Sequence, residues 1–333
     1  MKDYAEIYSN LPIEIFLFFS EKKDGEVWKP NTVFEFCSHY KNKFKTDEMP
    51  QPRYVSAICE KLVNAGKLSV HSRGGIDSTD NRYFAFLRDE NIRNNQYALE
   101  FLNLHLSFIS YGFPYIYNYY KSHVLPVLFI NTEEAQALGT CFRYQNAIVS
   151  AKHCFEGAKR IAIQGINSEI LSKANFIIHE NELMDLIYIE IPDLELLPPF
   201  SGSAEILDEV ITLGYPKIAG YHNFLSAEKA TVSSRFTATV GQVAACAEDI
   251  WIRENLFLIT AKIQGGNSGG PVINREGRIV GVSVNVSKGK GDYDDLGYGT
   301  VIPISFVDED IVNKKSCKPF DASKIEFIDF DNE

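Results

Sequence analysis

The chain has 333 residues, of which 45% are hydrophobic and 23% charged, so it is too long for one ordinary core and too apolar to be disordered. The net charge is −11, and residues 1–95 contribute nothing to it, because they carry 14 basic and 14 acidic side chains. An acidic chain is repelled by phosphate backbones and by anionic lipid, so neither nucleic acid nor a membrane is an expected partner.

The first 19 residues contain no basic region followed by a long apolar stretch and a cleavage site, so they do not predict a signal peptide. The longest apolar runs are far shorter than the roughly 20 residues that span a bilayer. We therefore expect a cytoplasmic protein, in which the six cysteines are mostly thiols.

Residues 1–90 combine helical segments with a hairpin. The spacing of apolar residues in Arg53–Ala65 predicts a helix that ends at Gly66, and Thr32 marks the start of an earlier helix. Two short β-prone runs follow, Leu68–His71 and Tyr83–Phe86. This order of elements resembles a winged helix-turn-helix domain, although no short motif supports the resemblance.

Winged helices bind either DNA or protein partners. The third predicted helix carries only Arg53 and Lys61 as cations, and Glu60 offsets them, whereas a DNA-reading helix usually lies among several Lys and Arg residues. The sequence therefore favours a protein partner or activator at this domain, and DNA binding is the alternative.

Residues 91–122 predict a connecting helical segment, and beyond it the pattern changes to short β-prone runs separated by turn residues. Many such strands indicate an all-β sandwich or a pair of barrels. We expect a multidomain α+β protein in which residues 123–310 form two β-barrels, about 123–200 and 205–310, before an acidic tail at 311–333. The predicted strands are Val124–Ile130, Ala147–Ser150, Arg160–Ile163, Leu186–Ile191, Val210–Leu213, Phe257–Ile259, Val272–Ile273, Arg278–Val286 and Gly299–Ile302.

A serine hydroxyl becomes a nucleophile when a base, a group that orients the base, and donors for the developing oxyanion surround it. The turn Gly265–Pro271 supplies the candidate Ser268, and its glycines let the amides of Gly266 and Ser268, with Asn267 between them, face one carbonyl oxygen. A purely structural turn is the alternative. With Thr260–Gln264 before it, the turn resembles the trypsin-like (chymotrypsin-fold) serine proteases, especially their bacterial high-temperature-requirement, or Deg-type, branch.

The resemblance implies the other two members of a catalytic triad. Ser150–Cys154 is similar to the family segment that holds the general base, which would be His153. Asp185, just before an apolar strand, matches the aspartate that orients the base, and Asp193 is its rival. The order His, Asp, Ser is that of chymotrypsin-type proteases.

Further matches extend the resemblance to roughly residues 124–307. The implied substrate-binding residues are Lys262, Ser283, Val284, Asn285, Gly299 and Thr300. Ser283 stands where the family often has a serine near the catalytic aspartate. Lys262 stands six residues before Ser268, where trypsins place an aspartate, so a preference for Lys or Arg is not expected. Lys262 either selects an acidic side chain or turns to solvent, and the sequence leaves both alternatives open.

The sequence contains no metal motif and no phosphate loop, so we expect neither a metal nor a cofactor. Secreted members of the family bridge a cysteine pair similar to Cys141 and Cys154, on either side of the His153 hairpin. In a cytoplasmic chain we expect two buried thiols instead.

The predicted function is that of a serine endopeptidase that cleaves protein or peptide substrates through an acyl-enzyme. Its amino-terminal domain would regulate it, in bacterial stress or defence. Two alternatives stay open. One is a catalytically silent sensor or scaffold with a protease fold, and the other is a DNA-linked regulatory protease.

Overall fold

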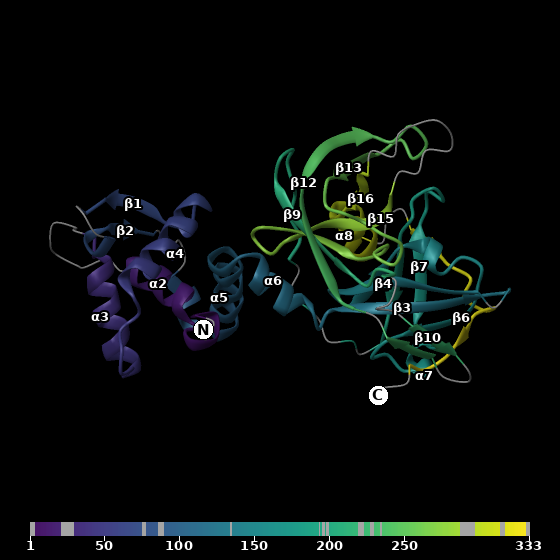
Figure 1. Cartoon of the computed structure of the whole chain (residues 1–333), viewed down its shortest axis with the longest axis horizontal. Coiled ribbons are helices and arrows are strands. Elements are labelled where there is room, and N and C mark those ends of the chain that lie inside the picture. The colour runs from purple at the N-terminus through teal and green to yellow at the C-terminus, as the bar shows by residue number, and fades with distance from the viewer. Residues whose placement is uncertain are drawn as a thin grey trace. The chain divides into compact units, whose positions relative to one another are not determined.

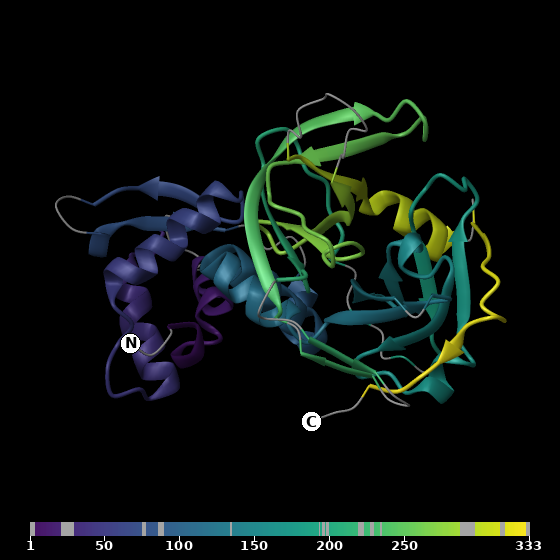
Figure 2. The same cartoon turned by 45° about the vertical axis from the view of Figure 1, so that its right-hand side comes forward.

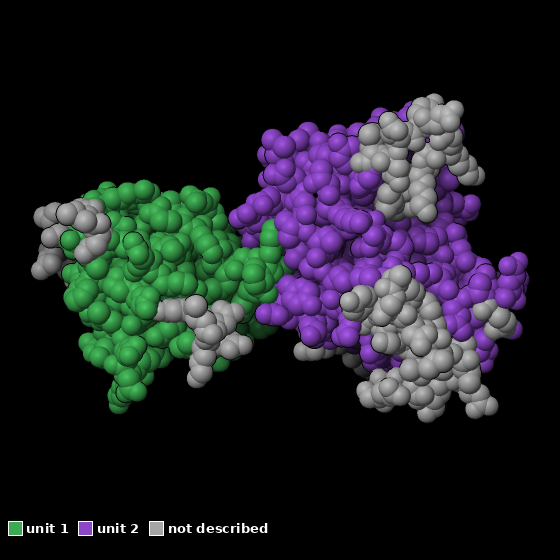
Figure 3. Space-filling view, viewed as in Figure 1, with its two compact units in different colours: residues 1–116 green, residues 117–333 purple. Residues whose placement is uncertain are grey.

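The computed structural model describes residues 4–20, 30–74, 78–85, 90–133, 135–192, 194, 197, 200–218, 223–226, 230–233, 235–286, 297–313 and 317–330. The chain divides into two compact units, Met1–Ile116 and Tyr117–Glu333, which are green and purple in Figure 3.

The first unit is built from helices and one two-stranded sheet (Figure 1). Strands β1 and β2 are antiparallel, with Ser69 opposite Phe84. The described elements are α1 Tyr4–Ile7, α2 Leu11–Phe19, α3 Val33–Phe44, α4 Pro52–Asn64, β1 Ser69–Ser72, η1 Ser78–Asp80, β2 Arg82–Phe84, η2 Glu90–Asn94 and α5 Gln96–Tyr111. Helices followed by a hairpin is the order that the sequence predicts for this region.

Local signals fix the ends of two of these helices. The Thr32 hydroxyl accepts a hydrogen bond from the Glu35 amide at 3.1 Å, and the Glu35 carboxylate accepts one from the Thr32 amide at 2.6 Å. This capping box begins α3. Gly66 follows the end of α4 with a φ of +67°, which favours glycine. Both ends agree with the sequence prediction.

Helix α5 belongs to the core of the first unit. The buried side chains of this core come from α2, α3, α4, the hairpin and α5, which contributes Leu106. The sequence predicted that residues 91–122 form a connecting segment between the domains. The structure differs, because this segment does not stand apart from the first unit. Its first helix packs within the first unit, and its second, α6 (Phe113–Tyr120), crosses the boundary between the units.

The second unit contains one closed barrel and one large sheet (Figure 2). The barrel has the order β12-β13-β16-β15-β14-β9, and the sheet has the order β17-β7-β8-β5-β4-β3-β6-β18. The barrel strands are β9 Glu209–Gly214, β12 Thr237–Glu248, β13 Asn255–Ile259, β14 Pro271–Asn274, β15 Ile279–Val286 and β16 Gly299–Pro303. The sheet strands are β3 Val124–Asn131, β4 Gln136–Tyr144, β5 Ala147–Ser150, β6 Ala158–Ile163, β7 Asn175–His179, β8 Ile187–Glu190, β17 Cys317–Pro319 and β18 Glu326–Phe327.

The remaining described elements of this unit are η3 Lys152–Cys154, α7 Ser168–Leu171, the hairpin of β10 Asn223–Ser226 and β11 Ala230–Ser233, and α8 Ile304–Asn313. Two closed barrels were expected, and one is observed, within the range 205–310. The strands of 123–200 instead form the middle of the eight-stranded sheet, which runs from β17 to β18 without closing among the described strands.

The segment 311–333 is not an acidic surface tail. Strand β17 pairs antiparallel with β7, and β18 pairs parallel with β6, so this segment supplies both edges of the sheet. Ile328 is buried against Leu128, Ile130 and Ala162. Strand pairing and apolar burial therefore hold a segment that the sequence analysis expected to be a surface tail.

The sheet register brings two strand ends together at the candidate site. Ser150, the last residue of β5, pairs with Cys141 of β4 and with Ile187 of β8. His153 follows β5 by three residues and Asp185 precedes β8 by two, so both lie at the same end of these paired strands. In the described part of the chain, no helix is long and apolar enough to cross a membrane.

Candidate active site

His153 and Asp185 form a close pair. His153 lies in the turn η3, where its backbone amide donates to Asp185 Oδ1 at 2.8 Å. Its ring Nδ1 lies 2.6 Å from Asp185 Oδ2. One carboxylate therefore holds both the backbone and the ring of the same histidine, and the ring Nε2 is left for another partner. The rival Asp193 lies outside the described residues.

The pair changes the acidity of the imidazole. The hydrogen bond to Asp185 is the main cause that raises the pKa of His153 well above its ordinary value. The Cys154 thiol acts in the same direction, and burial opposes both. The carboxylate thus stabilises the imidazolium, the form that a general base reaches when it accepts a proton.

Glycine is required at two positions of the turn around Ser268. Gly266 has a φ of +102°, and a Cβ added there would lie 2.4 Å from the Tyr215 carbonyl oxygen. Gly269 has a φ of +86°, and its Cβ would lie 2.1 Å from the Thr140 carbonyl oxygen. Both obstacles are backbone atoms, so another residue would displace the turn.

Contacts with β4 and β5 place Ser268 beside the histidine turn. The Thr140 amide donates to the Ser268 carbonyl at 2.9 Å. A Cβ on Gly269 would also meet the Ala151 amide nitrogen at 2.7 Å, two residues before His153. Ser268 is half-buried, and its hydroxyl makes no hydrogen bond to the residues that the structure describes.

Three amides of the turn have no acceptor among the described residues, those of Gly265, Gly266 and Ser268. The intervening Asn267 amide donates to the Gln264 carbonyl at 2.9 Å, so it is already used. The Asn267 side chain is buried, and its Oδ1 has no hydrogen-bond partner in the described chain. The amides of Gly266 and Ser268, which the sequence analysis assigns to the oxyanion, are therefore both available as donors, and the Asn267 amide is not.

The other predicted site residues lie in different surroundings. Lys262 is exposed, while its neighbour Ile263 is buried and occupies the space that a side chain at Gly299 would need. Ser283 and Val284 are buried in β15. Asn285 of β15 and Thr300 of β16 are opposite each other on adjacent barrel strands. The Asn285 side chain lies outside the described part.

Thr140 also belongs to the site, although it is not among the residues predicted from the sequence. Its buried hydroxyl donates to the Gly266 carbonyl at 2.6 Å and accepts from the Tyr215 amide at 3.0 Å. Together with the hydrogen bond that the Thr140 amide donates to the Ser268 carbonyl, these contacts hold β4 against the turn. The available signal was its place in the Gly-Thr-Cys-Phe segment that begins the histidine hairpin.

The cysteines of the hairpin, Cys141 and Cys154, are free and buried. A Cβ added at Gly139 would lie 2.6 Å from the Cys154 sulfur and 3.5 Å from its Cβ. Position 139 is therefore where a second cysteine would meet Cys154. The described residues contain no group of three His, Cys, Asp or Glu that could hold a metal ion.

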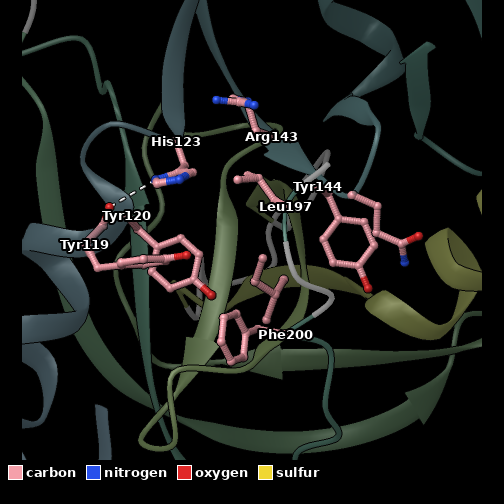
Figure 4. Close-up of a pocket in the computed structure, with 9 residues that line it drawn as sticks. Tyr119, Tyr120, His123, Arg143, Tyr144, Leu197 and Phe200 are labelled. Atoms are coloured by element: carbon pink, nitrogen blue, oxygen red, sulfur yellow. Dashed lines mark hydrogen bonds between the residues drawn. The ribbon is translucent and has the colours of Figure 1, made fainter. Parts of the chain in front are cut away.

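A pocket in the second unit is lined by none of these residues (Figure 4). Its wall includes the His123 ring, which stacks on Tyr119 with centroids 4.9 Å apart. The Tyr120 hydroxyl donates to the Gly277 carbonyl at 2.8 Å. Both contacts are made within the second unit, to which Tyr119 and Tyr120 at the end of α6 belong.

The family description "Trypsin-like peptidase domain" matches residues 138–282, a range that contains His153, Asp185 and Ser268. Among curated proteins, the serine endoprotease DegS of Haemophilus influenzae is 27% identical over 166 residues, which cover 49% of this chain and 45% of that protein. The serine protease Do-like HtrA of Bacillus subtilis is 28% identical over 183 residues, which cover 52% of this chain and 38% of that protein. The match thus spans less than half the length of each relative.

Two solved structures are also similar. The Rv3671c protease from M. tuberculosis, in its active form, has a TM-score of 0.46 at 19% identity, with 62% of this chain and 86% of that chain covered. The HtrA-type protease AlgW with tripeptide has a TM-score of 0.44 at 19% identity, with 60% of this chain and 64% of that chain covered.

Proposed function

We propose that this chain, which belongs to the trypsin-like peptidase family through residues 138–282, is a serine endopeptidase whose nucleophile is Ser268. The observation that carries the proposal is the pairing of His153 with Asp185 at 2.6 Å, beside a glycine turn that holds Ser268. A positioned base beside a serine hydroxyl that no described residue engages is the arrangement that acyl transfer requires.

In the proposed first step, Ser268 Oγ attacks the carbonyl carbon of the scissile peptide bond while His153 Nε2 accepts the hydroxyl proton. Nε2 is the accepting atom because Nδ1 faces Asp185. The carbonyl oxygen becomes an oxyanion, and the amides of Gly266 and Ser268 donate to it. These amides have no acceptor among the described residues, which supports that role.

In the second step, the carbon–nitrogen bond breaks, and the leaving amine takes the proton from His153. The carbonyl carbon stays bonded to Ser268 Oγ as an ester. Water then attacks this ester, His153 accepts the proton of the water, and the ester bond to Ser268 breaks with return of that proton to Oγ. Asp185 stabilises the imidazolium in both steps and is not itself protonated.

The substrate is a polypeptide, and we propose an apolar residue on the acyl side of the cleaved bond. Lys262 is exposed, and the buried Ile263 next to it faces Gly299. An apolar wall therefore supports this specificity better than an acidic preference set by Lys262. Cleavage of a peptide library by wild type and Lys262→Met tests it. Unchanged residue preference supports the apolar wall, and loss of an acidic preference contradicts it.

The first unit is proposed to act as a winged-helix-like protein-contact module that regulates cleavage. On α4, Lys61 donates to the Ser110 carbonyl at 2.6 Å, and Glu60 pairs with Arg73 at 2.8 Å. Lys61 and Arg73 are thus already bonded within the unit and are less available for phosphate groups, which supports a protein partner over DNA. Salt-dependent retardation of duplex DNA by the full chain would contradict this choice.

One observation favours the alternative of a catalytically silent scaffold: in the described structure, the Ser268 hydroxyl makes no hydrogen bond to His153. Such bonds are often long before substrate binds, so the endopeptidase stays the better proposal. To test it, wild type and Ser268→Ala are incubated with an unfolded polypeptide, and the products are identified by mass spectrometry. We expect new peptide termini with wild type alone. Equal cleavage by both proteins would show that the proposed mechanism is wrong.

A further inference from the structure

The orientation of the two amides proposed to bind the oxyanion, those of Gly266 and Ser268, depends on carbonyl groups one residue earlier. A peptide bond is planar and trans, so each N–H points away from the C=O of the preceding residue. The Gly266 amide is therefore aimed by the Gly265 carbonyl, and the Ser268 amide is aimed by the Asn267 carbonyl. Whatever holds these two carbonyl oxygens decides where the two amides point.

The Gly265 carbonyl accepts a hydrogen bond from the Lys217 amide at 2.8 Å. The Asn267 carbonyl accepts one from the Gly270 amide at 2.9 Å and one from the Ser283 hydroxyl at 2.8 Å. Among the described residues, Ser283 is the only one that holds either carbonyl with a side chain. Its substitution can therefore loosen one amide without removing a backbone contact.

The position of the Ser283 hydroxyl is itself fixed. Ser283 is 1% exposed and lies within β15. Its amide donates to the Gly270 carbonyl at 2.9 Å, and its carbonyl accepts from the Gly269 amide at 2.6 Å. The hydroxyl has one hydrogen and lies closer to the Asn267 oxygen than to the Gly270 oxygen, which is 3.1 Å away.

The sequence resemblance suggested a different place for this hydroxyl, near the catalytic aspartate. In the structure the Asp185 oxygens face the His153 amide and ring, at 2.8 and 2.6 Å. The Ser283 hydroxyl donates to the turn instead. The two positions of the hydroxyl predict different effects. A hydroxyl bonded to Asp185 would change the pKa of His153, whereas a hydroxyl bonded to the turn would change how well the oxyanion is stabilised.

We propose that Ser283 is a positioning residue for the oxyanion site: its hydroxyl holds the Asn267 carbonyl, and thereby aims the Ser268 amide at the developing negative charge. This inference rests on the proposed function. Removing one oxyanion donor lowers kcat by about 10²–10³-fold, so loosening one by Ser283→Ala is expected to lower kcat by about 10-fold or more.

The test measures kcat and KM for a cleaved peptide, the pH dependence of kcat/KM, and the inhibition constant of a peptide boronate, whose tetrahedral adduct resembles the transition state. For Ser283→Ala we expect lower kcat, unchanged KM, a boronate constant raised in parallel, and an unmoved acidic limb of the pH profile. Ser283→Thr keeps the hydroxyl and is expected to restore most of kcat. Thr212→Val removes a buried hydroxyl of the same barrel that bonds to Thr239 and serves as the control.

Three outcomes would overturn the role of Ser283 while wild type remains active. These are unchanged kcat in Ser283→Ala, an acidic limb that moves in either direction, or an equal loss in Thr212→Val. The second outcome would place the hydroxyl on Asp185. If wild type neither cleaves peptides nor binds the boronate, the proposed function itself fails, and the role of Ser283 fails with it.

Discussion

Within the turn around Ser268, position 269 has the least space for a side chain. Its φ of +86° disfavours any side chain, and a Cβ there would lie 2.1 Å from the Thr140 carbonyl oxygen, a backbone atom. We expect Gly269→Ala to lower the free energy of unfolding by more than about 3 kcal/mol and to abolish cleavage. Gly265→Ala is the matched control, because a Cβ at 265 meets nothing within 4 Å. Equal urea midpoints for the two variants would contradict this.

Asp185 sets the proton affinity of His153. Because its hydrogen bond raises the pKa of His153, Asp185→Asn is expected to lower that pKa. A general base must be neutral, so the acidic limb of kcat/KM should move to lower pH in the variant. The maximum rate should fall by about 10⁴-fold, as the wrong tautomer is favoured.

The measurement for Asp185→Asn is kcat/KM between about pH 5 and pH 11, a range that contains both the ordinary histidine pKa and the raised pKa of His153, about 10. Asp321→Asn, an exposed aspartate in the loop between β17 and β18, is the control and should leave the profile unchanged. A limb that stays in place, or moves to higher pH, would show that Asp185 does not orient the base.

The triad candidates could be predicted from short motifs, whereas the supporting contacts could not. Ser268, His153 and Asp185 each stand in a segment whose local pattern marks them. Thr140 and Ser283 act through hydrogen bonds to carbonyls more than ten residues away in the chain. Such contacts depend on how β4 and β15 meet the turn, and no local pattern encodes that meeting.

Strands with strong local signals were predicted well, and strands held by pairing alone were missed. The run Ala147–Ser150 is apolar and coincides with β5. In contrast, β12 (Thr237–Glu248) is rich in small and polar residues, and most of them are exposed or half-buried. The sequence of β12 has no alternating apolar pattern that would predict a strand, and its hydrogen-bonded pairing with β9 and β13 holds it in the barrel. The same reason explains β17 and β18, which are too short for a periodic signal.

The carboxy-terminal segment should stabilise the sheet through Ile328. This side chain is buried against Leu128, Ile130 and Ala162, so Ile328→Ala is expected to cost about 2–5 kcal/mol in free energy of unfolding. Lys324→Ala, at an exposed position of the same segment, should change it little. Urea unfolding of both variants checks this, and an unperturbed Ile328→Ala would mean that the segment is a surface tail after all.

Each of the two units has its own hydrophobic core. The core of the first unit runs from Leu11 to Leu106, and the barrel core of the second runs from Val210 to Val301. Domains with separate cores can unfold separately. The first unit could therefore change its state without unfolding the second unit, which is what the proposed regulation requires.

Calorimetry of the full chain tests this independence with two matched substitutions. Ile58 is buried in the first core and Ile259 in the second. We expect two unfolding transitions, with Ile58→Ala lowering the Tm of one and Ile259→Ala lowering that of the other, each at a cost of about 2–5 kcal/mol. A single transition that both substitutions shift equally would show that the units unfold as one.

Covalent labelling shows whether Ser268 is an activated nucleophile. The full chain is treated with a fluorophosphonate, which bonds to an activated serine hydroxyl with loss of fluoride, and the modified residue is located by mass spectrometry. We expect one adduct, on Ser268, that is absent in Ser268→Ala and that forms much more slowly in His153→Ala. An unlabelled Ser268 in folded wild-type protein, or labelling that His153→Ala leaves unchanged, would contradict it.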